Sequence, residues 1–145
     1  MISNEVIHIL NDLITLNKNR VTGYKEIVHE AKDESIAGHC REMIQQGDAN
    51  VRQLSGIIED SGGIVEDKTT TSGFIYNLWM DIVYSDEKEP KEGIYDYCRK
   101  MEQTTLKGYE ALLPQLKNEE QIYHLAEQHK TGIGDSLQML DKLLK

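Results

Sequence analysis

LNKNRVTGYKEIVHEAKDE, residues 16–34, and MEQTTLKGYEALLPQLKNE, residues 101–119, align without a gap at a constant offset of 85 residues. The dipeptide Gly23-Tyr24 in the first segment falls on Gly108-Tyr109 in the second. A repeated segment constrains topology more strongly than residue propensities do, so the chain is predicted to contain one helical pair twice. Apolar residues further along recur at nearly the same offset, as Val51, Leu54, Ile57 and Ile58 in one half and Leu137, Leu140, Leu143 and Leu144 in the other.

Apolar residues recur every three or four positions over four long segments, which is the pattern of helices with one buried face. The turn around Lys32 and Asp33 is so short that the helices on either side of it must be antiparallel neighbours. Pro90 suits the first position of a helix, whereas Pro114 is predicted to kink or end one. The predicted helices cover residues 4–31, 34–60, 90–116 and 119–144, each to within a few residues.

Residues 61–89 differ in composition from the rest of the chain, with glycines, a run of threonines and then an aromatic-rich stretch. We interpret this segment as a long crossover that carries one short helix, at about residues 72–84. The apolar face formed by Phe74, Leu78 and Ile82 is expected to cover one side of the core. The alternative is that this face binds a partner.

Length, charge and composition restrict the class of protein. A chain of 145 residues is long enough for one core without disulfides. Its formal net charge of −9, with basic and acidic residues interspersed, argues against a nucleic-acid partner. The sequence shows neither a secretory leader nor a segment that would span a membrane, and two cysteines are too few for a disulfide framework. We therefore expect a single all-α domain over residues 1–145, an antiparallel four-helix bundle in the cytoplasm.

Four short motifs are spread over the chain: LNDLI at residues 10–14, Gly23-Tyr24, WMD at residues 79–81, and Glu102 seven residues before Tyr109. With these motifs the chain resembles an uncharacterised bacterial branch of the ferritin-like superfamily, a family of domains of unknown function. The resemblance covers essentially the whole chain. It implies a ferritin-like bundle, in which two helix hairpins are joined by one long crossover, and it brings no catalytic activity with it.

Ferritin-like oxidases hold two irons or manganeses with a Glu on each of two helices and a Glu-x-x-His on each of the other two. The repeat indicates the corresponding positions in this chain. Glu102 matches the Glu of the third helix, but its equivalent in the first helix is Asn17. The second helix offers Gln45 and Asp48, and the fourth has His129 with no Glu three residues before it.

One carboxylate and one imidazole therefore remain of the expected ligands, and neutral amides cannot offset the charge of two divalent ions. We expect no metal and no other cofactor at this position. One alternative is a single iron or manganese held by Glu102, His129 and Asp48. The other is that these residues form a hydrogen-bonded polar layer, a feature that often sets helix register in bundles.

Gly47 and Gly132 fall inside predicted helices at the level of the candidate ligands. A glycine inside a helix costs about 1 kcal/mol relative to alanine, so something else should compensate. Close packing of a long side chain from the facing helix, such as Arg20 or Tyr24, is the expected reason. A small cavity is the alternative.

His39 and His124 occupy nearly equivalent places in the second and fourth helices. By the repeat they should lie level with Tyr24 and Tyr109, near the turn at residues 32–33. Such a group could bind a metal ion, or its members could hydrogen-bond one another at the rim of the bundle.

Cys40 and Cys98 project to levels about 16 Å apart along the bundle when the repeat is used to align the helices. This separation exceeds the span of a disulfide. We therefore expect two buried, unpaired thiols that pack as small apolar side chains.

The function predicted from the sequence is mainly negative: a non-catalytic bundle whose metal site has degenerated. It is expected to act through association with a second copy of itself, as a dimer, or with another protein. The competing hypothesis is an iron- or manganese-dependent oxidase or storage protein that uses Glu102 and His129.

Overall fold

The computed structural model describes residues 2–66 and 90–144, and over these residues the chain is helical and contains no strand. The short helix predicted at about residues 72–84 lies outside the described residues. The described part consists of four α-helices and one short 3₁₀ helix, namely α1 (Asn4–Glu30), α2 (Glu34–Asp60), α4 (Pro90–Leu112), η1 (Leu113–Leu116) and α5 (Glu120–Leu144).

The segment predicted as one helix over residues 90–116 is divided in the structure. α4 ends at Leu112, and Pro114 lies in η1. Proline has no N–H to donate and its ring clashes with the preceding turn of an α-helix, so the α-helical hydrogen bonding stops there. The structure thus shows that Pro114 ends the helix rather than kinking it.

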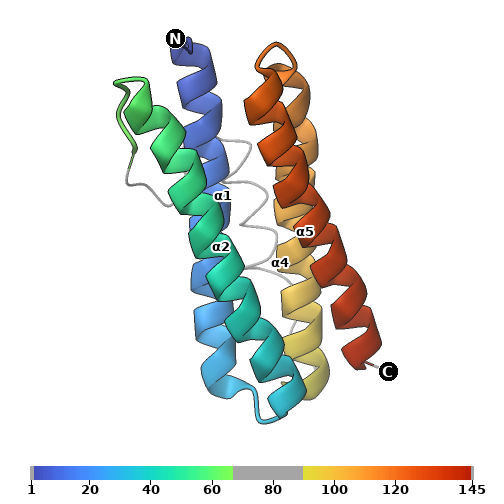
Figure 1. The fold of residues 1–145 in the computed structure, drawn as a ribbon. Coiled ribbons are helices and arrows are strands. Elements are labelled where there is room, and N and C mark those ends of the chain that lie inside the picture. The colour runs from blue at the N-terminus through green and yellow to red at the C-terminus, as the bar shows by residue number, and fades with distance from the viewer. Residues whose placement is uncertain (1, 67–89, 145) are drawn as a thin grey trace.

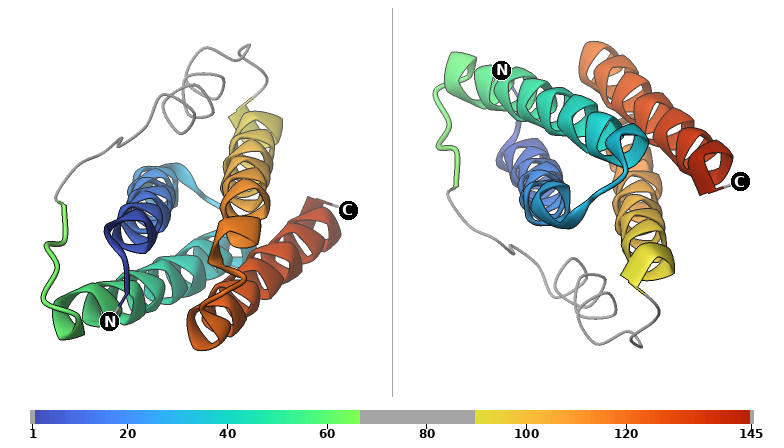
Figure 2. Two further views of the ribbon diagram at one scale, coloured as in Figure 1. Left: turned by 90° about the horizontal axis from the view of Figure 1, so that it is seen from above. Right: turned by 90° about the horizontal axis from the view of Figure 1, so that it is seen from below.

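The four helices pack side by side along the length of the molecule (Figures 1 and 2). α1 is antiparallel to α2, and α4 is antiparallel to α5. α2 finishes and α4 starts at opposite ends of the molecule, so these two helices run parallel and α1 and α4 run antiparallel (Figure 1). We call the end with the α1–α2 turn, residues 31–33, the turn end, and the opposite end, where α5 begins, the far end.

The contacts between the helices are uneven. α1 packs most extensively against α2 and also packs against α4, whereas α2 and α5 touch only sparsely. α1 is therefore the central element of the described structure.

The first two helices begin at side chains that satisfy free backbone N–H groups. The Ser3 hydroxyl accepts a hydrogen bond from the backbone N–H of Val6 at 3.2 Å. The Asp33 carboxylate accepts one from the N–H of Ser35 at 2.9 Å. Both residue types are preferred at this position for that reason.

The end of α2 depends on Gly62, whose φ of 80° is readily available only to glycine. The chain then returns onto α1, where the Asn11 side chain holds it. Asn11 donates to the carbonyl of Ile64 at 3.1 Å and accepts from the N–H of Glu66 at 2.9 Å. The first residues after α2 are thereby fixed against α1.

The interior has an apolar region toward each end and a polar region between them. The far-end cluster includes Leu10, Leu13 and Leu116, and the turn-end cluster includes Tyr24 and Ile36. Buried polar residues occupy the middle of the molecule and extend toward both ends, among them Asn17, Arg20, His39, Asn50, Glu102, Thr105, His129 and Ser136.

The helical glycines mark close contacts between helices. A Cβ on Gly47 would clash with Val21 of α1, and one on Gly132 would press on the Gln46 side chain of α2. Close packing is therefore the reason for both glycines, as predicted. The packing side chains are Val21 and Gln46, however, and not Arg20 or Tyr24.

No helix within residues 2–66 and 90–144 combines the length and the apolar character that crossing a membrane requires.

Candidate functional site

The middle of the interior holds an ion pair between α1 and α4. Arg20 donates from Nε to Glu102 Oε1 at 2.5 Å and from Nη2 to Oε2 at 2.8 Å, and both side chains are fully buried. Nη2 also donates to Met43 Sδ on α2 at 3.2 Å. Nη1 is buried without a hydrogen-bond partner among the described residues. Two parallel hydrogen bonds to one carboxylate give the pair both strength and a fixed orientation.

The positions of the two residues along their helices explain why they are buried. Arg20 lies four residues after Leu16 and four before Tyr24, so it shares their face of α1. Glu102 lies four residues after Cys98 and shares its face of α4. Because Leu16, Tyr24 and Cys98 are fully buried, each charged side chain is carried into the core by its apolar neighbours.

The electrostatics of the pair follow from this burial. Burial lowers the pKa of the Arg20 guanidinium, but the Glu102 carboxylate more than offsets it and the net shift is upward. Removing two charges from water costs several kcal/mol per ion, which only their mutual attraction and good geometry can offset. Each member of the pair therefore depends on the other to remain in the core.

A separate chain of hydrogen bonds lies on the far-end side of the ion pair. Asn50 Nδ2 donates to Asn17 Oδ1 at 3.0 Å, and Asn17 Nδ2 donates to the Tyr109 hydroxyl at 2.7 Å. The Tyr109 hydroxyl lies 3.0 Å from His129 Nδ1, and His129 Nε2 lies 2.7 Å from Gln53 Oε1. Gln53 Oε1 can only accept, so the ring proton of the neutral His129 is on Nε2. Nδ1 is then an acceptor, and the Tyr109 hydroxyl donates to it while accepting from Asn17.

His129 is held in its neutral form by its surroundings. Burial lowers the pKa of His129 to about 4, and the positive charge of Arg20 contributes to the shift. Burial likewise raises the pKa of Tyr109. Both groups therefore keep a single protonation state around neutral pH, and the hydrogen-bond chain has one defined direction.

A second, smaller polar group lies toward the turn end. The rings of Tyr24 and His39 meet edge to face with centroids 6.0 Å apart. Ser136 of α5 joins them, with its Oγ 2.9 Å from His39 Nε2 and 3.4 Å from the Tyr24 hydroxyl. Burial lowers the pKa of His39, and Glu102 acts in the opposite direction.

The residues predicted as metal ligands do not come together at one site. Glu102 has both oxygens in the ion pair, and His129 has both ring nitrogens in the hydrogen-bond chain. Asp48 is partly exposed on α2, and Gln45 is exposed. Within the described residues, no three His, Cys, Asp or Glu side chains form a group that could hold a metal ion. The donors present do not fit the two-metal site that the ferritin-like resemblance implies.

The predicted gathering of two imidazoles and two phenols near the turn is wrong. His124 is exposed and lies beside Glu127, and the ring that meets Tyr109 is His129, with centroids 6.0 Å apart. α1 and α4 run antiparallel, so equivalent positions of the repeat lie on opposite sides of the middle of the molecule. Tyr24 and Tyr109 are therefore placed toward opposite ends.

The predicted separation of Cys40 and Cys98 is wrong for the same reason. Both are fully buried in the turn-end cluster, and each thiol is near enough to shift the pKa of the other. The antiparallel direction of α4 brings Cys98 toward the turn, whereas the repeat offset placed it toward the far end.

Sequence reasoning did not predict the partner of Glu102. The signal was nevertheless present, because Arg20 is a charged residue in register with the buried stripe of its helix. Glu102 interrupts its own stripe in the same way. Two opposite charges that interrupt apolar stripes on different helices indicate a buried ion pair.

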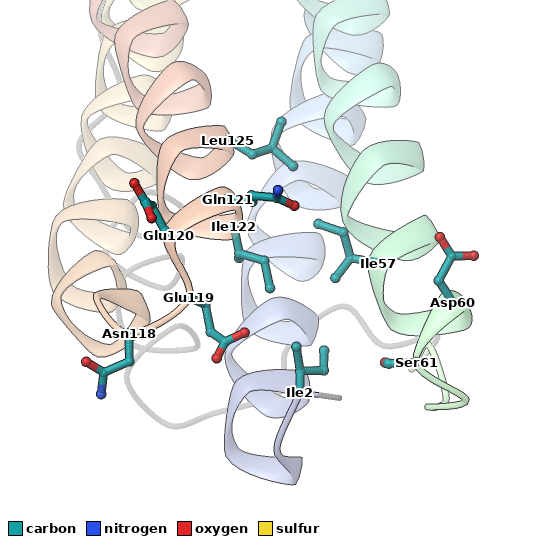
Figure 3. A pocket seen from close by; sticks show the side chains of 10 residues that line it. All are labelled: Ile2, Ile57, Asp60, Ser61, Asn118, Glu119, Glu120, Gln121, Ile122 and Leu125. Atoms are coloured by element: carbon teal, nitrogen blue, oxygen red, sulfur yellow. The ribbon is translucent and has the colours of Figure 1, made fainter.

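An open cleft lies at the far end, between the start of α5 and the end of α2 (Figure 3). Its volume is about 770 Å³. Ile57 of α2 and Leu125 of α5 point toward each other across it, while Asp60 and Glu120 lie at its sides (Figure 3). The described residues that line it are Ile2, Ile57, Asp60, Ser61, Asn118, Glu119, Glu120, Gln121, Ile122 and Leu125.

The fold and its interior define a class: a four-helix protein whose core contains a neutralised ion pair and a directed chain of hydrogen bonds. Within that class, the chain belongs to the family described as Domain of unknown function (DUF2383), whose model matches residues 5–115. The ion pair and Tyr109 lie inside the matched region, and His129 lies outside it. No curated protein matches the chain.

Proposed function

We propose that this protein is a non-catalytic ferritin-like bundle in which the Arg20 guanidinium takes the place of the metal ions, and that it acts by binding another protein. The parallel directions of α2 and α4 support the ferritin-like topology, because such folds join two hairpins by one long crossover. The internal repeat supports the same arrangement.

The observation that carries this proposal is the bidentate pair of Arg20 with Glu102. In a ferritin-like metal site, carboxylates are neutralised by metal cations. Here the one matching carboxylate is neutralised by a guanidinium in a fully buried position. A metal ion at Glu102 would have to displace Arg20 and would then face an unpaired buried positive charge, which is strongly unfavourable at low dielectric.

The test is metal content after the protein has been purified without chelator and exposed to Fe(II) or Mn(II) without oxygen. We expect no bound metal that depends on Glu102. Because the chain carries a net charge of −9, surface carboxylates can bind metal ions weakly. The Glu102→Gln variant is the matched control, and its metal content should equal that of the parent protein.

A stoichiometry near one or two metals per chain that is lost in Glu102→Gln would reject the proposal. It would favour the competing function, an iron or manganese oxidase or store. His129 would then be tested as the second ligand by His129→Gln, which should lose the same metal.

The far-end cleft is the surface that we assign to the protein partner. Its walls include Ile57, Ile122 and Leu125, and among the described residues that line it are three carboxylates but no Lys or Arg. A second copy related by a two-fold axis would bring the same acidic groups together, which is unfavourable. A cationic amphipathic helix fits better, because its apolar face can fill the cleft while its basic face meets Asp60, Glu119 and Glu120.

A synthetic helical peptide with leucines on one face and lysines on the other serves as the probe, with calorimetry as the measurement. Binding should weaken as salt is raised, and Leu125→Lys should weaken it by at least about tenfold. Met139→Lys, at an exposed apolar position on the same helix, is the matched control and should leave binding unchanged. Equal binding by both variants would show that the peptide does not bind in the cleft. A stable two-chain mass in light scattering would show that the protein associates with a second copy of itself instead of a different protein.

A further inference from the structure

Cys40 of α2 and Cys98 of α4 take no part in the hydrogen-bond chain or in the far-end cleft. Both side chains are fully buried and both belong to the turn-end cluster, and each thiol shifts the pKa of the other. A disulfide can join two helices where the cysteines lie at the same level and on facing sides.

The register of α1 against α2 gives the level of the first cysteine. The hydrogen bond from Asn50 to Asn17 aligns these two residues across the antiparallel helices. Cys40 lies ten residues before Asn50, so it is level with about Ile27 of α1.

The register of α1 against α4 gives the level of the second cysteine independently. The ion pair aligns Arg20 with Glu102, and Cys98 lies four residues before Glu102. Cys98 is therefore level with about Tyr24. The two cysteines agree in level to within one helical turn.

A cleft at the turn end gives solvent an approach to the pair. Its volume is about 430 Å³, and its walls include Ile36 of α2 together with Ile94 and Tyr95 of α4. Cys40 and Cys98 follow Ile36 and Ile94 by four residues, so each thiol lies one turn deeper on the same helix face. A small opening of these apolar walls would expose both sulfurs.

The two thiols are chemically unequal. The hydrogen bond from Cys98 lowers the pKa of Cys40, and the same contact together with burial raises the pKa of Cys98. The nearby charge of Arg41 also favours the Cys40 thiolate. Because the thiolate is the reactive form, Cys40 is the residue that attacks first.

From this geometry we propose that Cys40 and Cys98 are a modification site, a dithiol that forms a reversible disulfide between α2 and α4 when it meets a small-molecule disulfide such as oxidised glutathione. The bond would link the two helix hairpins covalently at the turn end. Neither the cleft at the far end nor the ion pair is required for it.

The reaction proceeds by two thiol–disulfide exchanges. The Cys40 thiolate attacks one sulfur of oxidised glutathione, which forms a mixed disulfide and releases one glutathione thiolate. Cys98, after losing its proton to water, attacks the Cys40 sulfur and releases the second glutathione. Two protein thiols are oxidised and one glutathione disulfide is reduced to two thiols, so electrons and protons balance.

The experiment equilibrates the full chain with glutathione buffers of graded redox ratio, alkylates free thiols and measures the intact mass. The expected product is a monomer two hydrogens lighter than the dithiol form, resistant to alkylation and restored by reductant. The equilibrium constant for its formation should be at least about tenfold larger for the folded chain than for the chain in denaturing urea, because the fold holds the thiols together. By the same linkage, the oxidised chain should unfold at a higher urea concentration.

Cys40→Ser and Cys98→Ser are the matched controls, and neither should yield the lighter monomer. Slow access to buried thiols is addressed by repeating the equilibration in urea below the unfolding transition, which speeds local opening. A native chain that stays reduced there, or that forms only mixed or intermolecular disulfides, would overturn the proposal. An oxidised chain that is less stable than the dithiol form would do so as well.

Discussion

Two tyrosine–histidine pairs lie on opposite sides of the ion pair, and they have nearly the same geometry. Tyr24 and His39 have ring centroids 6.0 Å apart at 74°, and Tyr109 and His129 have centroids 6.0 Å apart at 77°. The tyrosines are equivalent positions of the repeat, but the histidines are not, because the equivalent of His39 is the exposed His124. The repeat thus accounts for the positions of the two tyrosines, whereas the histidines beside them stand at positions that the repeat does not relate.

The two pairs differ in how the ion pair acts on them. The positive charge of Arg20 lowers the pKa of His129, in the same direction as burial does. At His39 the effect of Glu102 is larger than that of Arg20, so the carboxylate raises the pKa and opposes the effect of burial. The ion pair therefore acts as a dipole. Its positive end lowers the pKa of His129, and its negative end raises the pKa of His39.

The largest expected effect comes from breaking that dipole. Glu102→Leu leaves Arg20 buried and unpaired, and it should lower the free energy of unfolding by about 3–5 kcal/mol. The double variant Arg20→Met, Glu102→Leu removes both charges and should be close to the parent in stability, or above it. Urea unfolding of Glu102→Leu and of the double variant measures this. A double variant that is no more stable than Glu102→Leu would show that the two charges do not depend on each other.

The next effect is a pH dependence that separates the two histidines. The unfolded chain binds a proton at His129 near the ordinary pKa of 6.5, but the folded chain does so only near 4. Stability is therefore lost as pH falls through this window, by up to about 3 kcal/mol. Unfolding measured from pH 7 to pH 4 should show this slope. His129→Gln should remove most of it, and a slope that survives there but disappears in His39→Gln would reverse the assignment.

A smaller effect distinguishes the two tyrosines. Tyr109→Phe removes the hydroxyl that accepts from Asn17 and donates to His129, and it should cost about 1–3 kcal/mol because buried partners are left unsatisfied. Tyr24→Phe loses only a 3.4 Å contact with Ser136 and should cost below about 1 kcal/mol. Thermal unfolding of the two variants, otherwise matched, gives the comparison. Equal losses would mean that the hydrogen-bond chain adds nothing to the stability of its side of the core.

The smallest effect concerns two glycines of α2, one in the middle of the molecule and one toward the far end. Gly47→Ala would force its new methyl group against Val21, whereas an alanine at position 56 would meet nothing within 4 Å. Gly56→Ala should therefore stabilise the protein by up to about 1 kcal/mol through helix propensity. Gly47→Ala should be destabilising by about 1 kcal/mol, since overpacking outweighs that gain. Stabilisation by both would show that the middle of the α1–α2 contact is looser than the structure indicates.

The all-helical fold could be predicted from the sequence because helix formation depends on local patterns. The three-and-four spacing of apolar residues and the short turn around Asp33 are read without knowledge of distant contacts. Pro114 predicted an interruption of the helix for the same reason, although the sequence left open whether the helix would kink or end there.

The candidate site was less predictable because it depends on how the two halves meet. The repeat matches Asn17 with Glu102, and it predicts that equivalent positions lie at the same height along the bundle. Because α1 and α4 are antiparallel, this prediction is correct only near the middle of the helices. The position of Glu102 could therefore be predicted, but its partner Arg20 could not. Cys40 and Cys98 were misplaced by the same step.

Arg20 and Glu102 are separated by 82 residues in the sequence, whereas the contacts within each hairpin are local. Local contacts form early in folding, and contacts that close a long loop form late. An interaction that is absent from the folding transition state changes the unfolding rate and leaves the folding rate nearly constant. The ion pair should accordingly govern the lifetime of the native protein far more than the speed at which it forms.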